Sequence, residues 1–243
     1  MKRIIVNNLS KKFKIGIRAN RNALSRFISI FSGRETKKEI LALKNISFEA
    51  ESGEVVGLIG KNGSGKSTLL RAIARIYDKD GGEIITNGNL ISIINLNIGL
   101  RERLTMRDNV SFCCSIFGLS VKQIRERFNS IVEFAELKDF VDTKLYQFSS
   151  GMLQRLAFSI AVHCNPDILL LDEVFEVGDE SFKKKSAEKI KELVAKGASV
   201  LLVSHELDMI KRHCNKIVWL DKGRIIMKGK SKDVIEKYIQ DQL

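Results

Sequence analysis

A glycine-rich loop between an apolar run and a helical pattern constrains this chain more than any other feature. Residues 55–59 are apolar, the next nine read Gly60-Lys61-Asn62-Gly63-Ser64-Gly65-Lys66-Ser67-Thr68, and the apolar spacing of a helix follows. This is the pattern G-x-x-x-x-G-K-[ST] in a strand, loop, helix context. Its glycines let successive amide groups point at phosphate oxygens, and the start of the helix adds its dipole. The loop therefore predicts that residues 60–68 bind the phosphates of a nucleotide.

Two side chains of this loop have separate predicted roles. Lys66 is placed to reach the β and γ phosphates, and the Ser67 hydroxyl is placed to bind Mg²⁺. The alternative is a chance glycine-rich turn before a helix. At average residue usage the full pattern would arise by accident in about one chain of this length in a hundred, so we expect ATP and Mg²⁺ as cofactors.

A pair of carboxylates follows another apolar run farther along the chain. Residues 165–173 read Asn-Pro-Asp-Ile-Leu-Leu-Leu-Asp-Glu and end in Asp172 and Glu173. At the carboxyl end of a parallel strand, side chains face the crevice where open α/β sheets bind ligands. Asp172 is then placed to hold Mg²⁺, and Glu173 to orient and deprotonate an attacking water. Since many strands end in charged turns, this assignment depends on the phosphate loop upstream.

Length and apolar content favour one large domain that spans residues 1–243. The chain is 44% apolar, which suffices for one substantial core. Its apolar runs stop far short of the ~20 residues that span a bilayer, and its start carries no cleavage pattern of a secretory signal, so we expect a cytosolic chain. The net charge of +12 favours polyanions, nucleotide phosphates or an anionic membrane surface as neighbours, without choosing among them.

Apolar strands alternate with amphipathic helices, which indicates an α/β layer with a largely parallel sheet. Two regions differ from this alternation: a basic insertion at 14–40 and an all-helical subdomain at 104–149. The predicted strands are 4–9, 46–49, 54–59, 90–96, 168–171, 200–204, 216–220 and 224–227; the predicted helices are 66–76, 106–117, 121–135, 151–164, 182–196, 206–214 and 233–242.

The cysteines predict neither a disulfide framework nor a zinc site. Cys113, Cys114, Cys164 and Cys214 form no C-x-x-C pair, and adjacent cysteines are poorly placed to bridge each other. The alternative is a metal site built from the repeated His-Cys dipeptides at 163–164 and 213–214. We expect reduced thiols, most of them in the core.

Three further segments resemble an ABC ATPase. Residues 147–155 read Gln-Phe-Ser-Ser-Gly-Met-Leu-Gln-Arg and are similar to the family signature L-S-G-G-Q, with matches at Ser149 and Gly151. Residues 202–205 resemble the segment that ends in the switch histidine, and 177–179 occupy the place of the D-loop. The order of phosphate loop, signature, Asp-Glu pair and switch histidine is typical of this family alone among P-loop proteins.

The resemblance implies a fold and a mode of action. The fold would be a P-loop α/β ATPase with a largely parallel sheet core, an antiparallel β-subdomain and a helical subdomain. Two copies would form a head-to-tail homodimer, in which Ser149, Ser150 and Gly151 of one copy close over the ATP that Lys66 of the other holds. A hydroxyl and a glycine at a helix start supply suitable donors to the γ phosphate.

The resemblance also assigns roles to single residues. His205 would act in catalysis with Glu173 and Lys66 by contacting the γ phosphate and the water, and Asp179 would line the contact between subunits. The aromatic side chain that stacks on adenine would be Phe13. The family's Q-loop glutamine is missing, and Asn95 or Asn97 is the candidate to replace it.

The departures from the common signature resemble a subgroup of the family. Phe148, Ser150 and Met152, with residues 176–182 and 104–109, are similar to the ATPase subunits that export bacterial O-antigen, capsule and teichoic acid. This implies a peripheral protein on the cytoplasmic face of the inner membrane, bound to a separate integral-membrane subunit, with no nucleic acid expected. Some of these subunits carry a carbohydrate-binding domain at the end of the chain; because few residues follow His205 in this sequence, we expect none here.

The insertion predicts a short basic amphipathic helix. Leu24, Phe27, Ile28 and Phe31 recur at helical spacing, with arginines nearby. Such a helix suits a membrane interface or a partner groove, and the resemblance suggests a gating or docking element. A surface helix packed on its own domain is the alternative. For the whole chain, the rival functions are an ABC motor for a lipid or drug, and a soluble ABC ATPase that acts on nucleic acid or ribosomes.

Overall fold

The computed structural model describes residues 1–15, 38–94, 99–172, 179–204 and 206–242. A six-stranded sheet forms its centre, in the order β5-β6-β7-β3-β8-β9. The four pairings from β5 to β8 are parallel, and β8 pairs with β9 antiparallel. The sequence prediction of an α/β fold with a largely parallel sheet is confirmed. The strands are β3 (Val55–Ile59), β5 (Leu90–Ile93), β6 (Ile168–Asp172), β7 (Ser199–Val203), β8 (Lys216–Asp221) and β9 (Arg224–Lys230).

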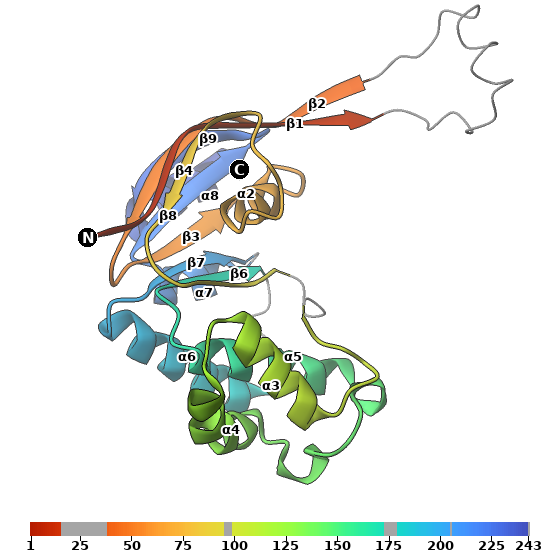
Figure 1. Ribbon diagram of the computed structural model, residues 1–243. Helices are drawn as coiled ribbons and strands as arrows, with labels where there is room; N and C mark the ends of the chain where they lie inside the picture. The colour runs from red at the N-terminus through yellow and green to blue at the C-terminus, as the bar shows by residue number, and fades with distance from the viewer. Residues whose placement is uncertain (16–37, 95–98, 173–178, 205, 243) are drawn as a thin grey trace, which may run out of the picture.

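A separate antiparallel sheet packs over one face of the central sheet (Figure 1). Its strands are β2 (Lys38–Glu51), β1 (Lys2–Ile15) and β4 (Gly81–Thr86), in that order. The pairing of β1 with β2 continues as far as Ile15 and Lys38, so both strands are longer than the sequence predicted.

Helices lie on both sides of the central sheet and in a cluster beyond it (Figure 1). Each predicted helix is present, with ends within about two residues in most cases. The starts of two helices have a clear cause. Thr105 and Ser120 each form a reciprocal capping box with the residue three positions later in the chain. The helices are α2 (Lys66–Ile73), α3 (Met106–Ile116), α4 (Val121–Ala135), α5 (Ser150–His163), α6 (Glu180–Ala195), α7 (Leu207–His213) and α8 (Ser231–Gln242), with short 3₁₀ helices at Lys138–Phe140 and Leu145–Gln147.

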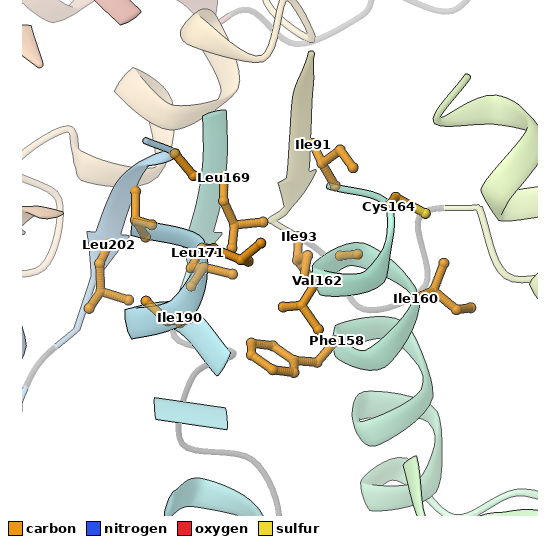
Figure 2. Packing of buried hydrophobic residues seen from close by; sticks show 14 of the residues in the cluster. Ile91, Ile93, Phe158, Ile160, Val162, Cys164, Leu169, Leu171, Ile190 and Leu202 are labelled. Atoms are coloured by element: carbon orange, nitrogen blue, oxygen red, sulfur yellow. The ribbon is translucent and has the colours of Figure 1, made fainter. Parts of the chain in front are cut away.

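The central strands are buried on both faces, as a covered parallel sheet requires. In β6 the side chains alternate: Ile168 and Leu170 face the cluster under the antiparallel sheet, whereas Leu169 and Leu171 face the helices. Figure 2 shows the helical side of this core, where Phe158 and its neighbours on α5 pack against β5, β6, β7 and α6. This packing fixes α5 relative to the sheet.

None of the helices in the described ranges is both long enough and apolar enough to cross a bilayer.

Candidate functional site

The phosphate loop joins β3 to α2 at the carboxyl edge of the central sheet. β3 lies between β7 and β8, in the middle of that sheet. The loop turns sharply because Gly60, Gly63 and Gly65 have φ values of 143°, 77° and 110°. A Cβ atom at Gly60 would lie 2.1 Å from the Leu220 carbonyl oxygen. The glycine at this position is therefore required by packing as well as by conformation.

The loop presents donors and a positive charge at the start of α2. Gly65 is the residue before the helix, and it supplies no side-chain cap to the first amide groups. Those amides are the donors that an anion at a helix N-terminus accepts from. The Lys66 ammonium is buried and donates to the carbonyl oxygens of Gly60 at 2.7 Å and Lys61 at 3.1 Å. The loop carbonyl groups therefore surround the Lys66 ammonium, and the first backbone amides of α2 face the position of a ligand.

The Ser64 hydroxyl of the loop is buried without a hydrogen-bond partner among the described residues, and Ser64 is 2% exposed. A buried hydroxyl without a partner costs about 1–3 kcal/mol. Its presence fits a loop whose hydrogen bonds are completed by a phosphate group. Ser67 and Thr68 follow Lys66 in the first turn of α2, so the Ser67 hydroxyl is placed at the same helix start.

A cavity of about 410 Å³ opens beside the loop. One wall is the loop itself. The opposite wall comes from β2 and from the turn between β8 and β9, and the sequence predicted none of these residues as part of the site. Three lysines contribute positive charge, and no carboxylate is among the described lining residues. The lining residues are Ile40, Leu41, Ala42, Lys44, Asn62, Gly63, Gly65, Lys66, Ser67, Thr68, Lys222 and Gly223.

The new wall offers an apolar surface to a ligand. Ile40 and Leu41 are 41% and 37% exposed, which is high for large aliphatic side chains on a strand. Phe13, which the sequence predicted as the adenine contact, is not among the lining residues. Its ring packs edge-on against Tyr77, with a centroid distance of 5.3 Å, and the Lys11 ammonium lies over it. The large apolar side chains that line this cavity are therefore aliphatic.

Asp172 ends β6 at the same edge of the sheet. β6 is separated from β3 by one strand, β7, and all three are parallel. Their carboxyl ends therefore meet at one edge, where Asp172 is half-buried. The loop that follows β3 leads to Ser67 at the same edge. A carboxylate and a hydroxyl oxygen are suitable ligands for Mg²⁺, which prefers oxygen donors and keeps several waters. The carboxylate of Asp172 and the hydroxyl of Ser67 therefore fit the Mg²⁺ ion of a bound nucleoside triphosphate.

The signature residues lie on a different part of the molecule, at the start of α5 (Figure 1). Ser149 caps this helix, because its hydroxyl accepts a hydrogen bond of 3.2 Å from the Met152 amide. Ser149 and Ser150 are exposed and Gly151 is half-exposed. A Cβ atom at Gly151 would have only the Ser149 hydroxyl within 4 Å, so the helix start is open to a ligand.

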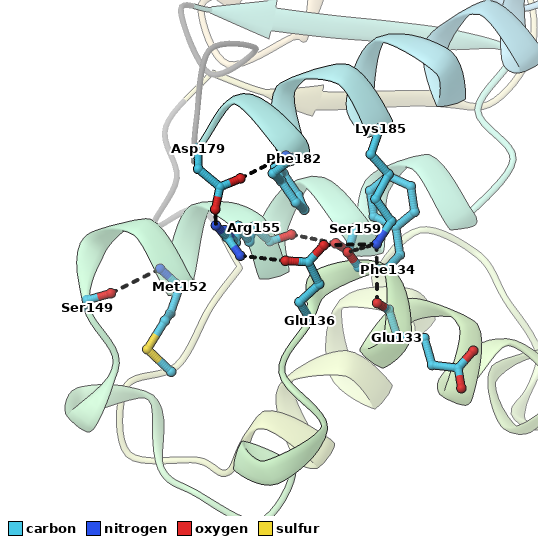
Figure 3. Close-up of polar contacts among 10 residues, drawn as sticks. All are labelled: Glu133, Phe134, Glu136, Ser149, Met152, Arg155, Ser159, Asp179, Phe182 and Lys185. Carbon is cyan, nitrogen blue, oxygen red and sulfur yellow. Dashed lines mark hydrogen bonds and ion pairs between the residues drawn. The ribbon is translucent and has the colours of Figure 1, made fainter.

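Asp179 caps another helix and forms an ion pair with Arg155 of α5 (Figure 3). Its Oδ1 accepts from the Phe182 amide at 2.9 Å. This amide, and after it Arg155, hold the pKa of Asp179 below the usual value of its carboxyl group. Asp179 is therefore an anion at the first turn of α6, where the helix dipole favours negative charge. The sequence analysis assigned no role to Arg155, although it lies in the signature segment.

Several predicted residues lie outside the described part of the chain. These are Glu173, His205, the Q-loop candidates Asn95 and Asn97, and residues 16–37 of the insertion. Their roles remain predictions from the sequence.

The four cysteines lie apart from this site. All four are buried free thiols, and the Sγ atoms of Cys114 and Cys164 are 3.6 Å apart. Burial raises the pKa of Cys113 to about 11 and that of Cys214 to about 12. These values keep both thiols protonated near neutral pH.

Comparison with known proteins adds an independent line of evidence. The ABC transporter family matches residues 43–176. The chain is 39% identical over 231 residues to the teichoic acids export ATP-binding protein TagH of Lactococcus lactis, covering 95% of this chain and 49% of that protein. It is also 39% identical over 203 residues to the O-antigen export system ATP-binding protein RfbB of Klebsiella pneumoniae, covering 84% of this chain and 82% of that protein. The chain thus spans about half the length of the Lactococcus relative.

Solved structures give the same fold. An ATP-binding subunit of an ABC transporter superposes with a TM-score of 0.79 at 25% identity, covering 97% of this chain and 92% of that one. A dimeric ATP-binding cassette bound to ADP and phosphate superposes with a TM-score of 0.76 at 24% identity, covering 94% and 98%.

Proposed function

Since the chain belongs to the ABC transporter family, we propose that it is the ATP-hydrolysing subunit of an exporter of a bacterial cell-surface polysaccharide or lipid-linked glycan. The observation that carries the ATPase part is the cavity beside the phosphate loop, with its amide donors, its three lysines and the carboxylate of Asp172 at the same sheet edge. The glycan part is supported by the similarity to teichoic acid and O-antigen export proteins.

In this proposal some residues of the site bind the nucleotide and others take part in its hydrolysis. Residues 60–68 bind the phosphates, with Lys66 on the β and γ groups, and the aliphatic wall at Ile40 and Leu41 contacts the base. Ser67 and Asp172 would hold Mg²⁺, which would supply charge neutralisation at the transferred phosphate. Glu173 accepts a proton from the attacking water, and His205 contacts the γ phosphate.

A homodimer completes the site. Ser149, Ser150 and Gly151 lie at an exposed helix start on a different part of the chain from the phosphate loop. A second copy in head-to-tail orientation would bring this helix start over the nucleotide, where its amides and hydroxyls donate to the γ phosphate. Asp179 lines the contact between the two copies. ATP binding closes this dimer and hydrolysis opens it.

The membrane-crossing part of the exporter is a separate subunit in this proposal. The chain would lie on the cytoplasmic face of the bacterial inner membrane, bound to that subunit and without nucleic acid. The net charge of +12 supports a location beside anionic lipid headgroups. The segment at 14–40 is proposed to dock on or gate the membrane subunit.

Replacing Glu173 by Gln tests the catalytic assignment. The variant should bind ATP, remain as a dimer on a sizing column and lose almost all turnover, because the amide cannot accept the proton. Glu126→Gln, an exposed change on α4, is the matched control and should leave turnover unchanged. Turnover close to wild type in Glu173→Gln would remove Glu173 as the base.

Copurification tests the transport assignment and its rivals. The tagged chain is recovered from gently solubilised membranes of its own cell, and the bound components are identified. A stoichiometric polytopic membrane protein with attached glycolipid supports the exporter. A membrane protein with another lipid or a drug indicates a different cargo, and recovery with nucleic acid or ribosomes would overturn the transporter while keeping the ATPase.

A further inference from the structure

The turn between β8 and β9 has an unusual residue at its first position. Asp221 of β8 pairs with Arg224 of β9, so the turn consists of Lys222 and Gly223 alone. Their φ values are 45° and 78°. Positive φ at both central residues is characteristic of a type I′ turn, which favours Asn, Asp or Gly at its first position. Lys222 is therefore a side chain that the geometry of the turn alone would not select.

The left-handed conformation of Lys222 is energetically unfavourable. Asparagine tolerates this conformation because its short polar side chain forms local hydrogen bonds, and lysine lacks such a side chain. The chain itself follows this preference, since three of the six non-glycine residues with positive φ in the described ranges are asparagines. Residues held in such conformations gather at ligand sites, where the surrounding structure fixes them. The lysine at this position therefore calls for an explanation outside the turn.

The surrounding backbone holds this turn against the phosphate loop. The Gly223 amide donates to the Ser64 carbonyl oxygen at 2.9 Å, and the Gly223 carbonyl oxygen accepts from the Lys44 amide at 2.7 Å. A Cβ atom at Gly65 would lie 3.7 Å from the Gly223 Cα. β2 contacts both β9 and α2, so the three elements meet here (Figure 1). The backbone of Lys222 is thus fixed beside the residue that precedes α2.

The turn stands beside the middle of the nucleotide in the proposed site. The β and γ phosphates bind at the start of α2, and the base contacts the aliphatic wall at residues 40–41. Ala42 lies between these two ends, because its carbonyl oxygen would be 2.9 Å from a Cβ atom at Gly65 and 2.4 Å from one at Gly223. The part of a nucleoside triphosphate that joins the base end to the β phosphate is the ribose with the α phosphate. Lys222 is therefore next to the position of that phosphate.

The charge of Lys222 suits this neighbour. Lys222 lines the cavity, and no carboxylate is among the described lining residues that could neutralise its ammonium group there. The side chain is exposed, so it can reach a ligand that enters from solvent. A hydrogen bond between an ammonium and a phosphate oxygen is stronger than one between neutral groups. Lys66 is assigned to the β and γ phosphates, which leaves the α phosphate for Lys222.

We propose that Lys222 is a nucleotide-binding residue whose ammonium group binds the α phosphate. The inference rests on the proposed ATP-binding function. Lys66 and the amides of α2 recognise the terminal phosphates, whereas Lys222 contributes affinity that ATP, ADP and AMP share. The unfavourable conformation of the turn is retained for this contact, because asparagine would suit the turn and lysine suits the ligand.

The test measures the Kd of ATP, ADP and AMP in the full chain, by competition with a fluorescent ADP analogue. Lys222→Met keeps the Cβ atom, and with it the conformational cost of the turn, and removes only the charge. We expect its Kd to rise about five- to tenfold for each of the three nucleotides, because a hydrogen bond to a charged group is lost. Lys66→Met should raise the Kd of ATP far more than that of AMP. Lys230→Met is the matched control, because it removes the same charge at the exposed far end of β9, and it should leave all three values unchanged.

Two further variants separate binding from folding. Asparagine suits the first position of a type I′ turn, so Lys222→Asn should unfold at a higher urea concentration than the wild type. Its nucleotide affinity should nevertheless fall as in Lys222→Met, so stability and binding change in opposite directions. Lys222→Arg keeps the positive charge and should recover most of the affinity for all three nucleotides.

Other outcomes would overturn the inference. Equal Kd values in Lys222→Met and Lys230→Met would make Lys222 a solvated lysine of the turn. A loss confined to ATP would place its ammonium group at the γ phosphate and not at the α phosphate. A fall of both stability and affinity in Lys222→Asn would show that the lysine serves the fold. Failure of the wild-type chain to bind ATP, or no response to Lys66→Met, would overturn the proposed function itself.

Discussion

Gly223 is the residue through which the cavity wall is joined to the phosphate loop. It lies in the turn between β8 and β9, with φ of 78°. Its amide donates to the Ser64 carbonyl oxygen at 2.9 Å, and its carbonyl oxygen accepts from the Lys44 amide at 2.7 Å. A Cβ atom at this position would lie 2.4 Å from the Ala42 carbonyl oxygen. Because that neighbour is backbone, the strand and the turn must separate to admit a methyl group.

The cost of Gly223→Ala follows from two terms. A left-handed conformation costs a residue with a Cβ about 1–2 kcal/mol. Opening the contact with Ala42 also weakens one or both hydrogen bonds of the turn, at about 0.5–1.5 kcal/mol each. The free energy of unfolding should therefore fall by about 1.5–5 kcal/mol. Nucleotide affinity should fall as well, since the same movement displaces Lys44 and Ser64.

Gly118→Ala is the matched control for this change. Gly118 also has a left-handed conformation, with φ of 87°, but a Cβ atom there would have no neighbour within 4 Å. In Gly118→Ala the free energy of unfolding should fall only by the cost of the left-handed conformation, about 1–2 kcal/mol, and nucleotide affinity should stay at the wild-type value. Denaturant titration of both variants, with and without nucleotide, gives the comparison. Equal losses of stability, or unchanged affinity in Gly223→Ala, would refute the reasoning.

Three further predictions concern the core. Phe158→Ala should lower the free energy of unfolding by about 3–5 kcal/mol in a denaturant titration, since the side chain is 1% exposed, whereas Phe140→Ala at 41% exposure should cost much less. Burial lowers the pKa of His163, so the unfolded chain binds more protons and stability should fall as the pH drops below 6.5; thermal unfolding of His163→Asn should show a weaker dependence on pH. Cys113 and Cys214 should resist alkylation at pH 8 in the folded chain and react after unfolding, as mass spectrometry would show.

Local signals in the sequence were enough to predict most of the helices. The start of α4 is set by Ser120 and Gln123, which form a capping box that four consecutive positions of sequence already reveal. The central strands were equally visible, because a parallel strand covered on both faces is a continuous apolar run. These elements are determined by residues that are close together in the chain.

Features that depend on distant pairing were missed. β4 (Gly81–Thr86) begins with two glycines, and only the short run Ile84-Ile85-Thr86 has strand-forming residues, so its own sequence is a weak indication of a strand; it forms because β1 offers an edge to pair with. The cavity wall at Ile40 and Leu41 is brought to the phosphate loop by β2, which precedes the loop by some twenty residues. The same applies to Arg155, whose two partners lie 19 and 24 positions away.

Asp179 has one role predicted from the sequence and a different one found in the structure. The sequence predicts a contact between subunits, whereas in the structure each carboxylate oxygen accepts one bond from its own chain, Oδ1 from the Phe182 amide and Oδ2 from Arg155. A carboxylate has about four acceptor positions, and this side chain is 61% exposed. Acceptor capacity therefore remains for a second copy. A carboxylate that its own subunit already orients loses little side-chain entropy when it meets a partner, so the ion pair with Arg155 prepares Asp179 for the contact that the sequence predicts.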